Sequence, residues 1–470
     1  MNVDSTGSIG VTADPHKVRP GMIYVDLSGR RNRRQIYEAY GNGASLIFTP
    51  YNISDPELPV IKVKNPQDTF YMVVDRFFGK QEHKAKLIGV LGDIDNSVLV
   101  ELIQSILYGK NNIVRTNSWS RSKINFGNRH NIEDFFSAFA DMYERGMDII
   151  PITIDTSTSS LFYCRNMSLD CAILTDRGSM ERNYKGLSII DYISGLSGKK
   201  TIIINNDENH GIKTAEENRE IKSITYGLNK KAAVTASSIA VDEITCFNYC
   251  VQKSFQSRSG VRIEPFEIPI HLSALGSHNI YNALAAITCG LYYDEDITNI
   301  KAAVESYKAP ARHFQKIFDG DFTIIDNYCR SIHDYTEAFD SMQILSYENL
   351  ILIISVSQDA NLAFHGEKAR LITEWVRILK CKEVILTSCM DGDFRIGELP
   401  IKSMRIYKKY FKENDVPFRY YHLLQHAIER GLAVLKKRDL MIMLGSDEMN
   451  SAHKIIHRQL RPVSEPKNQS

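Results

Sequence analysis

The chain has 470 residues, 43% of them apolar and 24% charged, which are values of a globular protein with roughly two to four domains. The formal net charge of +1 argues against a nucleic-acid-binding protein and against a polybasic membrane anchor. No apolar stretch reaches the ~20 residues of a membrane span, and the N-terminus shows no apolar secretory segment. With eight cysteines and no C-x-x-C spacing, we expect free thiols and a cytoplasmic location.

Residues 1–82 have the pattern of a small α/β domain. The sequence predicts a strand over 22–27, a helix over 33–44 that ends at glycine, and a strand over 58–63. The polar stretch that follows Gly79 predicts a linker to the next domain.

Residues 83–308 alternate between strand and helix patterns, which is typical of a parallel sheet. An irregular β-rich stretch over 220–272 interrupts the alternation, and two helices over 279–293 and 297–308 close the block. The earlier elements are predicted as strands over 86–90, 147–155, 169–176 and 199–207 and helices over 98–108 and 133–145.

Residues 309–462 predict a doubly wound sheet, because each apolar strand pattern is followed by a helical one. The predicted strands are 322–328, 350–356, 383–388, 417–421 and 440–445. Residues 463–470 form a polar tail that we expect to be disordered.

A segment between the first strand and first helix of the central block has the position of a phosphate-binding loop. Such a loop needs glycines that bare backbone N–H groups, a lysine for the outer phosphates, and Ser or Thr for Mg²⁺. Gly89, Gly92 and Ser97 fit this pattern. However, Asn96 occupies the lysine position and Asp95 occupies the preceding glycine position.

These replacements invert the charge of the loop. A lysine–phosphate contact is worth roughly 1.5–3 kcal/mol, and Asn96 cannot supply it. Asp93 and Asp95 add like-charge repulsion of several kcal/mol toward a polyanion. We therefore expect the loop to bind Mg-ATP weakly. Taken alone, the two glycines are more simply explained by a plain turn between strand and helix.

Five segments in one order resemble the Mur ligases, most closely the enzymes that add the third amino acid to UDP-N-acetylmuramoyl-dipeptide. The segments are VRPGMIYVDLSG (18–29), LIGVLGDIDNS (87–97), LGSHNIYNALAA (275–286), PARHF (310–314) and DNYCRS (326–331). The resemblance covers nearly the whole chain. It implies an α/β fold with three-domain Mur-ligase architecture: a UDP-substrate-type domain (1–82), an ATPase-like domain with a P-loop-like parallel sheet (83–308), and a Rossmann-like ligase domain (309–462).

The resemblance also implies a reaction and its cofactors. In the family, ATP with Mg²⁺ phosphorylates a carboxylate of the growing peptide, and an amino acid then attacks the acyl phosphate. Carried over by motif, the catalytic positions are Asp155, Arg312 and Asp326, with Ser97 and Asp155 as metal ligands. The cofactor-binding positions are Gly89, Gly92, Asn96, Ser97, His278, Asn279, Asn282 and Asp359.

Other positions that carry chemistry in the family differ in this chain. Ser159 and Cys329 stand where the family has histidines, and Asp191 lies near the place of a carbamylated lysine. The apolar framework is retained, which is the pattern expected of a catalytically degenerate homologue, because a core needs only volume and period. Such a protein would bind a UDP-sugar-peptide-like or other small-molecule ligand, or a protein partner, and act in binding or regulation.

Two further hypotheses remain open. In the first hypothesis, the chain is a divergent but active ATP-dependent amide ligase with a different substrate. In the second, it is a metal or small-molecule binder that uses Asp93, Asp95 and Asp155 as oxygen ligands. Several candidates also have purely structural explanations. Asp155 can simply end a strand, the α-helix starting near His278 can use its polar residues for capping, and Arg312 can serve as an interdomain salt-bridge residue.

Overall fold

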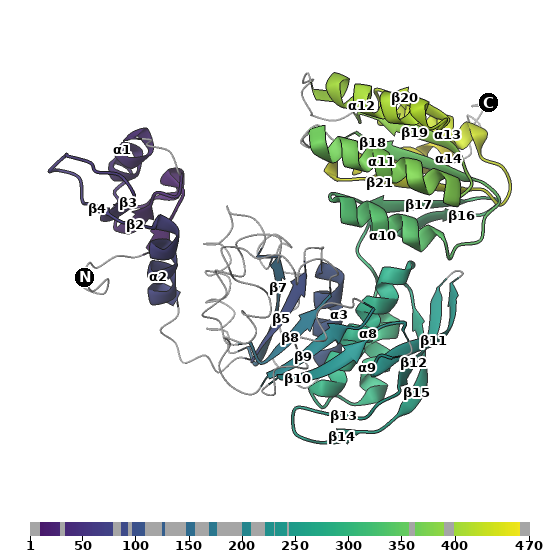
Figure 1. Ribbon diagram of the computed structural model, residues 1–470, viewed down its shortest axis with the longest axis horizontal. Coiled ribbons are helices and arrows are strands. Elements are labelled where there is room, and N and C mark those ends of the chain that lie inside the picture. The colour runs from purple at the N-terminus through teal and green to yellow at the C-terminus, as the bar shows by residue number, and fades with distance from the viewer. Residues whose placement is uncertain are drawn as a thin grey trace, which may run out of the picture. The chain divides into compact units, whose positions relative to one another are not determined.

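The computed structural model describes residues 10–28, 33–78, 86–92, 96–108, 125–126, 147–155, 169–175, 200–207, 221–229, 231–241, 244–356, 362–389 and 399–460. The chain divides into two compact units, residues 1–224 and 225–470. Figure 1 labels the helices and strands of both units. Among the described helices, none combines the length and the apolar character that crossing a membrane requires.

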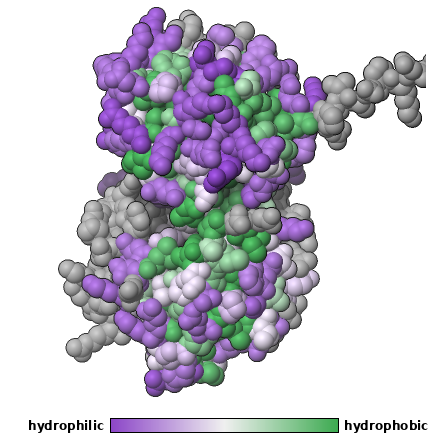
Figure 2. All heavy atoms as spheres, turned by 90° about the vertical axis from the view of Figure 1, so that its right-hand side faces the viewer, coloured by the Kyte–Doolittle hydropathy of each residue, from purple (hydrophilic) through white to green (hydrophobic). Residues whose placement is uncertain are grey.

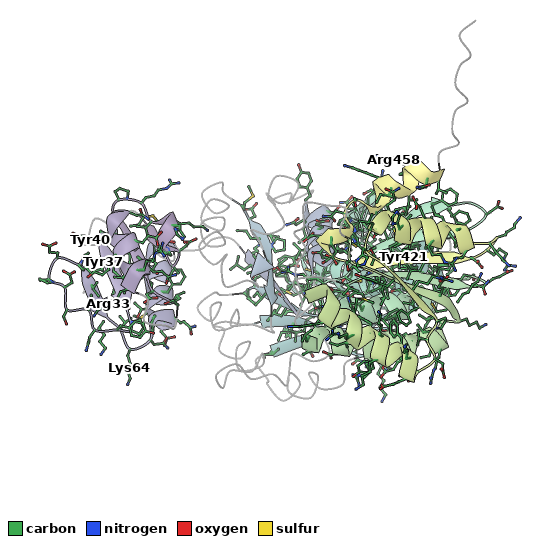
Figure 3. The ribbon with its side chains drawn as sticks, turned by 90° about the horizontal axis from the view of Figure 1, so that it is seen from above. Arg33, Tyr37, Tyr40, Lys64, Tyr421 and Arg458 are labelled. Carbon is green, nitrogen blue, oxygen red and sulfur yellow. The ribbon has the colours of Figure 1, made fainter. Side chains whose placement is uncertain are left out.

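The first unit begins with a four-stranded parallel sheet in the order β1-β2-β3-β4. Its predicted strands and helix are confirmed, whereas β1, β3 and α2 were not predicted. The elements are β1 (Gly10–Thr12), β2 (Met22–Val25), α1 (Arg33–Gly41), β3 (Leu46–Thr49), β4 (Val60–Lys62) and α2 (Pro66–Phe78). Figure 3 shows Arg33, Tyr37 and Tyr40 along α1, where the two tyrosines are among the more exposed large side chains.

A second parallel sheet in the same unit is centred on β5. Strand β5 (Lys86–Gly92) lies between β7 (Ile149–Asp155) and β8 (Cys171–Leu174) and leads into helix α3 (Ser97–Leu107). Strands β6 (Asn125–Phe126), beside β7, and β9 (Lys200–Asn205), beside β8, extend this sheet. The predicted parallel sheet is thus confirmed, and the predicted helix over 133–145 lies outside the described residues.

The second unit opens with the β-rich stretch that the sequence predicted. Strand β11 (Val234–Val241) pairs with the end of β10 (Ile221–Tyr226) and antiparallel with β12 (Thr245–Val251), which pairs with β15 (Phe266–Leu272). Strands β13 (Phe255–Gln256) and β14 (Arg262–Ile263) form a short hairpin. The two predicted helices follow as α8 (Ser277–Tyr292) and α9 (Ile297–Ser306).

The rest of the second unit is a six-stranded sheet in the order β16-β17-β21-β18-β19-β20. All pairings are parallel except that of the edge strand β16, which was not predicted. The strands are β16 (Gln315–Asp319), β17 (Thr323–Tyr328), β18 (Leu350–Ser355), β19 (Cys381–Thr387), β20 (Phe418–Tyr421) and β21 (Leu440–Gly445). The helices are α10 (Ile332–Met342), α11 (Leu362–Ile378), α12 (Leu399–Glu413), α13 (Leu424–Val434) and α14 (Ala452–Leu460).

Helices cover both faces of this sheet, as Figure 1 shows. Along β18, Leu350, Leu352 and Ile354 pack in the core under α10, α11 and α12, whereas Ile351 and Ile353 pack under α13 and α14. A parallel strand buried on both faces needs a continuous apolar run, which explains the sequence LILIIS. Hydrophilic side chains cover much of the molecular face shown in Figure 2.

Candidate functional site

The carboxyl ends of three neighbouring strands of the first unit bring several predicted site residues to one edge. Gly92, the last residue of β5, is in register with Asp155, the last residue of β7. Thr175 follows β8 on the other side of β5, and its backbone N–H donates to the carbonyl of Leu91 at 3.1 Å. Ligands of open parallel sheets bind at this kind of edge. The sequence-based grouping of Asp155 with the β5–α3 loop is therefore consistent with the strand register.

Asn96, in the position of the missing lysine, is held by the protein itself. The residue is 3% exposed and stands at the N-cap of α3, where its carbonyl accepts the first helical hydrogen bond from Val100. The side chain does not cap the helix; instead, the Thr175 hydroxyl donates to Oδ1 at 3.0 Å. That hydroxyl also lies 3.2 Å from the carbonyl of Leu91. Asn96 thus connects the start of α3 to the end of β8.

Gly89 has a packing explanation in the structure. It lies inside β5, between Ile152 of β7 and Ala172 of β8. A Cβ atom at this position would stand 2.6 Å from Cδ1 of Leu169. The glycine therefore lets a neighbouring leucine approach the strand.

The other predicted loop residues are described only in part or lie outside the described residues. The backbone of Gly92 ends β5, that of Ser97 begins α3, and that of Asp155 ends β7. Asp93, Asp95 and Asp359 lie outside the described residues, as do Ser159, Asp191 and the side chains of Ser97 and Asp155. Among the residues that are described, no group of three or more His, Cys, Asp or Glu side chains could hold a metal ion. The metal ligands Ser97 and Asp155 remain predictions.

The N-terminus of α8 in the second unit carries His278, Asn279 and Asn282. Asn279 is fully buried, and its Nδ2 donates to the carbonyl of Leu275 at 2.6 Å. Its Oδ1 has no hydrogen-bond partner among the described residues. An unpaired buried acceptor costs about 1–3 kcal/mol. Asn282 lies about one turn further along α8 and is half-buried.

His278 packs between two neighbouring elements. Its Nδ1 lies 3.2 Å from Oγ of Ser341 on α10, and its ring meets Phe314 edge-on at 6.2 Å between centroids. Burial lowers the pKa of His278, so the ring is neutral at physiological pH. Gly276 precedes it with φ +100, and a Cβ there would stand 2.7 Å from the His278 ring. These contacts support the packing role that the sequence left open.

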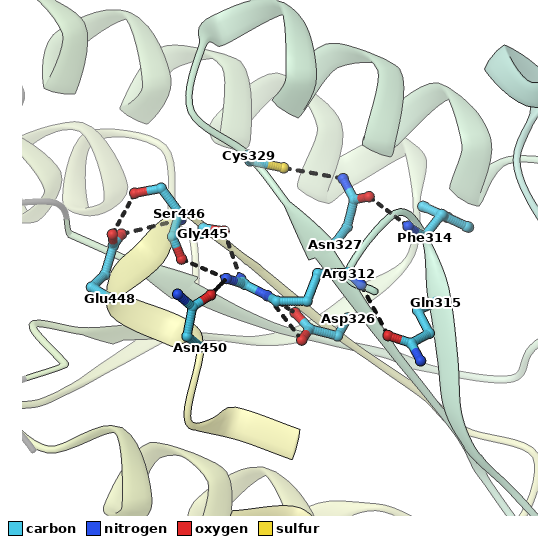
Figure 4. A network of polar contacts seen from close by, with 10 residues as sticks. All are labelled: Arg312, Phe314, Gln315, Asp326, Asn327, Cys329, Gly445, Ser446, Glu448 and Asn450. Carbon is cyan, nitrogen blue, oxygen red and sulfur yellow. Dashed lines mark hydrogen bonds and ion pairs between the residues drawn. The ribbon is translucent and has the colours of Figure 1, made fainter. Parts of the chain in front are cut away.

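Arg312 lies in a dense network at the start of the six-stranded sheet (Figure 4). Its Nε donates to both carboxylate oxygens of Asp326, at 3.2 and 3.0 Å. Its Nη1 donates at 2.7 Å to the carbonyl of Ser446 and to Oδ1 of Asn450, and its Nη2 donates at 2.7 Å to the carbonyl of Gly445. Arg312 and Asp326 are 9% and 1% exposed. Two residues predicted as catalytic therefore form an ion pair with each other, within the predicted 309–462 domain rather than between domains as the salt-bridge alternative had it.

The pKa of Asp326 is raised even though Arg312 is its ion-pair partner. Burial raises the pKa of its carboxyl, and the charge and hydrogen bonds of Arg312 act in the opposite direction. Its strand neighbour Asn327 accepts from the backbone N–H of Phe314 at 2.7 Å and donates to Sγ of Cys329 at 3.2 Å. Cys329 is buried, and burial raises the pKa of its thiol, so this thiol is not an activated nucleophile.

A buried lysine behind this network was not predicted. Lys368 of α11 is fully buried, and its Nζ donates to the carbonyl of Ser355 at 2.8 Å and to the Tyr335 hydroxyl at 3.2 Å. Three aromatic rings lie within 5.9 Å of Nζ, those of Tyr335, Phe364 and Tyr407. Burial lowers the pKa of Lys368 to about 8. The signal that could have revealed it in the sequence is that the helical period places Lys368 on the same face as the buried apolar residues of α11.

Glu448 is bound at the carboxyl ends of strands β18 and β21. Its carboxylate accepts hydrogen bonds from the hydroxyls of Ser355 and Ser446. Burial acts to raise the pKa of Glu448, but these hydrogen bonds outweigh burial and lower it. The carboxyl ends of β18 and β21 are therefore occupied by an ionised glutamate and its two serines.

Comparison with known proteins finds similarity to the Mur ligases. Residues 188–290 match the Mur ligase middle domain. The chain is 22% identical over 488 residues to the UDP-N-acetylmuramoyl-L-alanyl-D-glutamate--2,6-diaminopimelate ligase of Caldanaerobacter subterraneus, covering 99% of this chain and 94% of that protein. The chain is therefore similar to the Mur ligases, over nearly its whole length in the Caldanaerobacter comparison.

Solved structures of Mur ligases share the fold of the chain. The MurF ligase from Thermotoga maritima in complex with ADP matches with a TM-score of 0.66 and 14% identity, covering 97% of this chain and 99% of that one. A pseudomurein peptide ligase type C from Methanothermus fervidus matches with a TM-score of 0.55 and 14% identity, covering 93% of this chain and 86% of that one. The predicted α/β Mur-ligase architecture is confirmed, and the predicted domain boundaries near 82 and 309 remain predictions.

Proposed function

We propose that this Mur ligase homologue binds a peptidoglycan-precursor ligand of the UDP-sugar-peptide class and does not carry out ordinary ATP-driven ligation. The observation that supports this proposal is the state of Asn96. The family uses a lysine here to contact the outer phosphates, whereas the neutral Asn96 side chain is buried and hydrogen-bonded to Thr175. The residues of this loop do not fit a Mg-ATP site.

The energetic deficit is larger than one lost contact. The missing lysine removes a charge-assisted hydrogen bond of roughly 1.5–3 kcal/mol. Turning Asn96 toward a phosphate would also break its bond to Thr175, at a further cost of about 1 kcal/mol. Together these losses, about 2.5–4 kcal/mol, correspond to roughly a hundredfold to a thousandfold weaker nucleotide binding before the repulsion from Asp93 and Asp95 is added.

The hydrogen bonds of Arg312, which precedes the six-stranded sheet, support the same proposal. A mobile catalytic arginine would need free donors, whereas the Arg312 guanidinium already donates to Asp326, Asn450 and two backbone carbonyls. We propose that Arg312 and Asp326 stabilise the domain and take no direct part in chemistry.

A divergent ATP-dependent amide ligase is the second candidate function. Two observations favour it: Asp155 ends its strand directly beside Gly92, and Oδ1 of Asn279 has no described partner at the start of α8. In this alternative Asp155 holds Mg²⁺ at the end of β7. Cations from elsewhere in the chain would then have to replace the lysine.

Calorimetric titration of the full-length chain with Mg-ATP separates the two candidates. We expect a Kd weaker than about 10 µM, which corresponds to about −7 kcal/mol. The matched variant carries Asp93→Thr, Asp95→Gly and Asn96→Lys together, and we expect it to gain nucleotide affinity but little turnover, because effects within one catalytic unit are non-additive. A tighter Kd for the natural chain, with phosphate release that depends on an added amino acid, would establish the divergent ligase.

The ligand half of the proposal has its own measurement. The compound named for the Caldanaerobacter relative, UDP-N-acetylmuramoyl-L-alanyl-D-glutamate, is titrated into the chain without nucleotide. We expect saturable binding and a rise in Tm that grows with ligand concentration. If neither appears while the protein is folded, the inherited-ligand proposal is wrong, whatever the result with ATP.

A further inference from the structure

Helix α14 carries a pair of histidines that the proposed function does not use. His453 and His457 are one turn apart and lie on the same side of the helix, and both are exposed. Their Nε2 atoms are 3.0 Å apart, and their rings are 4.4 Å apart between centroids at an interplanar angle of 88°. Arg458, the next residue of the helix, is labelled in Figure 3.

A hydrogen bond between two Nε2 atoms requires that one of them carries the hydrogen and the other presents a lone pair. One neutral imidazole donates its hydrogen to the lone pair of the other, whereas two imidazolium rings would place two donors against each other. Two neutral imidazoles that face one another can also donate both lone pairs to a single cation.

The distance between the nitrogens is short enough for both to bind one cation, and the general affinity order of first-row divalent metals places Cu²⁺ above Zn²⁺ at such sites. With metal–nitrogen bonds of about 2.0–2.1 Å, nitrogens 3.0 Å apart subtend an angle of roughly 90–97° at the metal. A tetrahedral Zn²⁺ site would need the nitrogens about 3.3–3.4 Å apart for bonds of the same length. Angles near 90° are those of square-planar and octahedral sites, which Cu²⁺ and Ni²⁺ favour.

We propose that His453 and His457 form a surface chelate for a late first-row divalent cation, with Cu²⁺ and Ni²⁺ preferred over Zn²⁺. Two histidines separated by one helical turn are an established metal-binding arrangement, since both side chains leave the same face. In the described part of the chain no group of three or more potential ligands completes such a site. The remaining coordination positions are therefore open to water or to an external ligand.

The surroundings of α14 leave this face accessible. Ile456 and Ala452 point into the core, and Gln459 donates to Glu429 of α13 at 3.1 Å. Gln459 lies about 160° around the helix axis from His457 and about 120° from His453, so its contact with Glu429 is on a different face from the histidine pair. Lys454 and Arg458 flank the histidines on the same helix, and their positive charges limit the affinity for a cation.

The experiment titrates CuCl₂, NiCl₂ and ZnCl₂ into untagged full-length protein at pH 7.5, with a weak competing chelator to control free metal. We expect one site per chain at which Cu²⁺ binds at least tenfold more tightly than Zn²⁺. His453→Gln and His457→Gln should each weaken Cu²⁺ binding at least tenfold, because a chelate loses half its ligands. His426→Gln, which changes an exposed histidine of α13, is the matched control and should leave the affinity within twofold.

Electron paramagnetic resonance of the Cu²⁺ complex gives a readout that does not depend on affinity. We expect hyperfine coupling to two imidazole nitrogens in the natural chain and to one in either single variant. The proposal is wrong if His453→Gln and His457→Gln both leave Cu²⁺ affinity within twofold, or if the spectrum shows the same nitrogens in all variants. Because both histidines are exposed and glutamine suits a helix, these variants are expected to fold.

Discussion

Replacing Arg312 by methionine tests whether the buried network of Figure 4 stabilises the second unit. The change keeps the apolar stem and removes every guanidinium hydrogen bond. Asp326 then keeps its carboxylate at 1% exposure without a cation, and the carbonyls of Gly445 and Ser446 each lose one of their donors. Removing one partner of a buried ion pair costs about 3–5 kcal/mol.

The chain offers a closely matched control in Arg438. Its ion pair with Glu348 spans 3.4 Å between side chains that are 70% and 54% exposed, so its loss should cost about 0–1 kcal/mol. Arg312 and Arg438 both have φ +64, and any backbone cost of the methionine substitution is therefore the same at the two sites. The difference between the two variants measures the buried network.

Urea unfolding followed by tryptophan fluorescence is the assay. Trp375 stacks on Phe339 in the core of the six-stranded sheet, and a Trp119→Phe background leaves it as the single tryptophan. With an m-value of about 2 kcal/mol/M, we expect the Arg312→Met midpoint to fall by roughly 1.5–2.5 M and that of Arg438→Met by less than about 0.5 M.

The pH dependence gives a second test of the same reasoning. Loss of Arg312 should raise the pKa of Asp326 further, because burial already raises it and Arg312 opposes that effect. A carboxyl with a raised folded-state pKa stabilises the fold at low pH and loses that stabilisation as pH rises through the folded pKa. The Arg312→Met deficit should therefore be smaller at pH 5 than at pH 8. Equal midpoints for Arg312→Met and Arg438→Met would refute the assigned role.

Two further substitutions have expected outcomes. Asn96→Lys alone should lower the free energy of unfolding by about 1–3 kcal/mol, because it breaks the bond to Thr175 and buries a charge; a gain in thermal stability without nucleotide would contradict this. Lys368→Met should raise stability below pH 8 by about 1–3 kcal/mol, as an apolar side chain replaces a buried ammonium. Between pH 8 and 10.5 the unfolded chain holds one more proton at Lys368 than the folded chain, so the free energy of unfolding of the natural protein rises with pH. Unfolding of the Lys368→Met variant, measured as a function of pH, should lack this rise.

Local patterns in the sequence were sufficient for most of the second unit. The alternation of apolar strands and helices over 309–462 predicted the doubly wound sheet, because strand and helix periods are properties of neighbouring residues. The short strands β1 and β3 and the edge strand β16 were missed, since three to five residues carry too little periodic signal. The missing lysine at Asn96 was also visible in the sequence.

Only the tertiary structure decided what several of these residues do. Asn96 contacts Thr175, which is 79 positions away, and Arg312 donates to a carbonyl 133 positions away. Lys368 occupies a core position because α11 packs it against Tyr335 and the end of β18. Such partners depend on which strands become neighbours, and strand order is set by packing across the whole domain. Residue type and spacing determine the elements, whereas burial and distant partners determine whether a polar side chain is a ligand, a tether or part of the core.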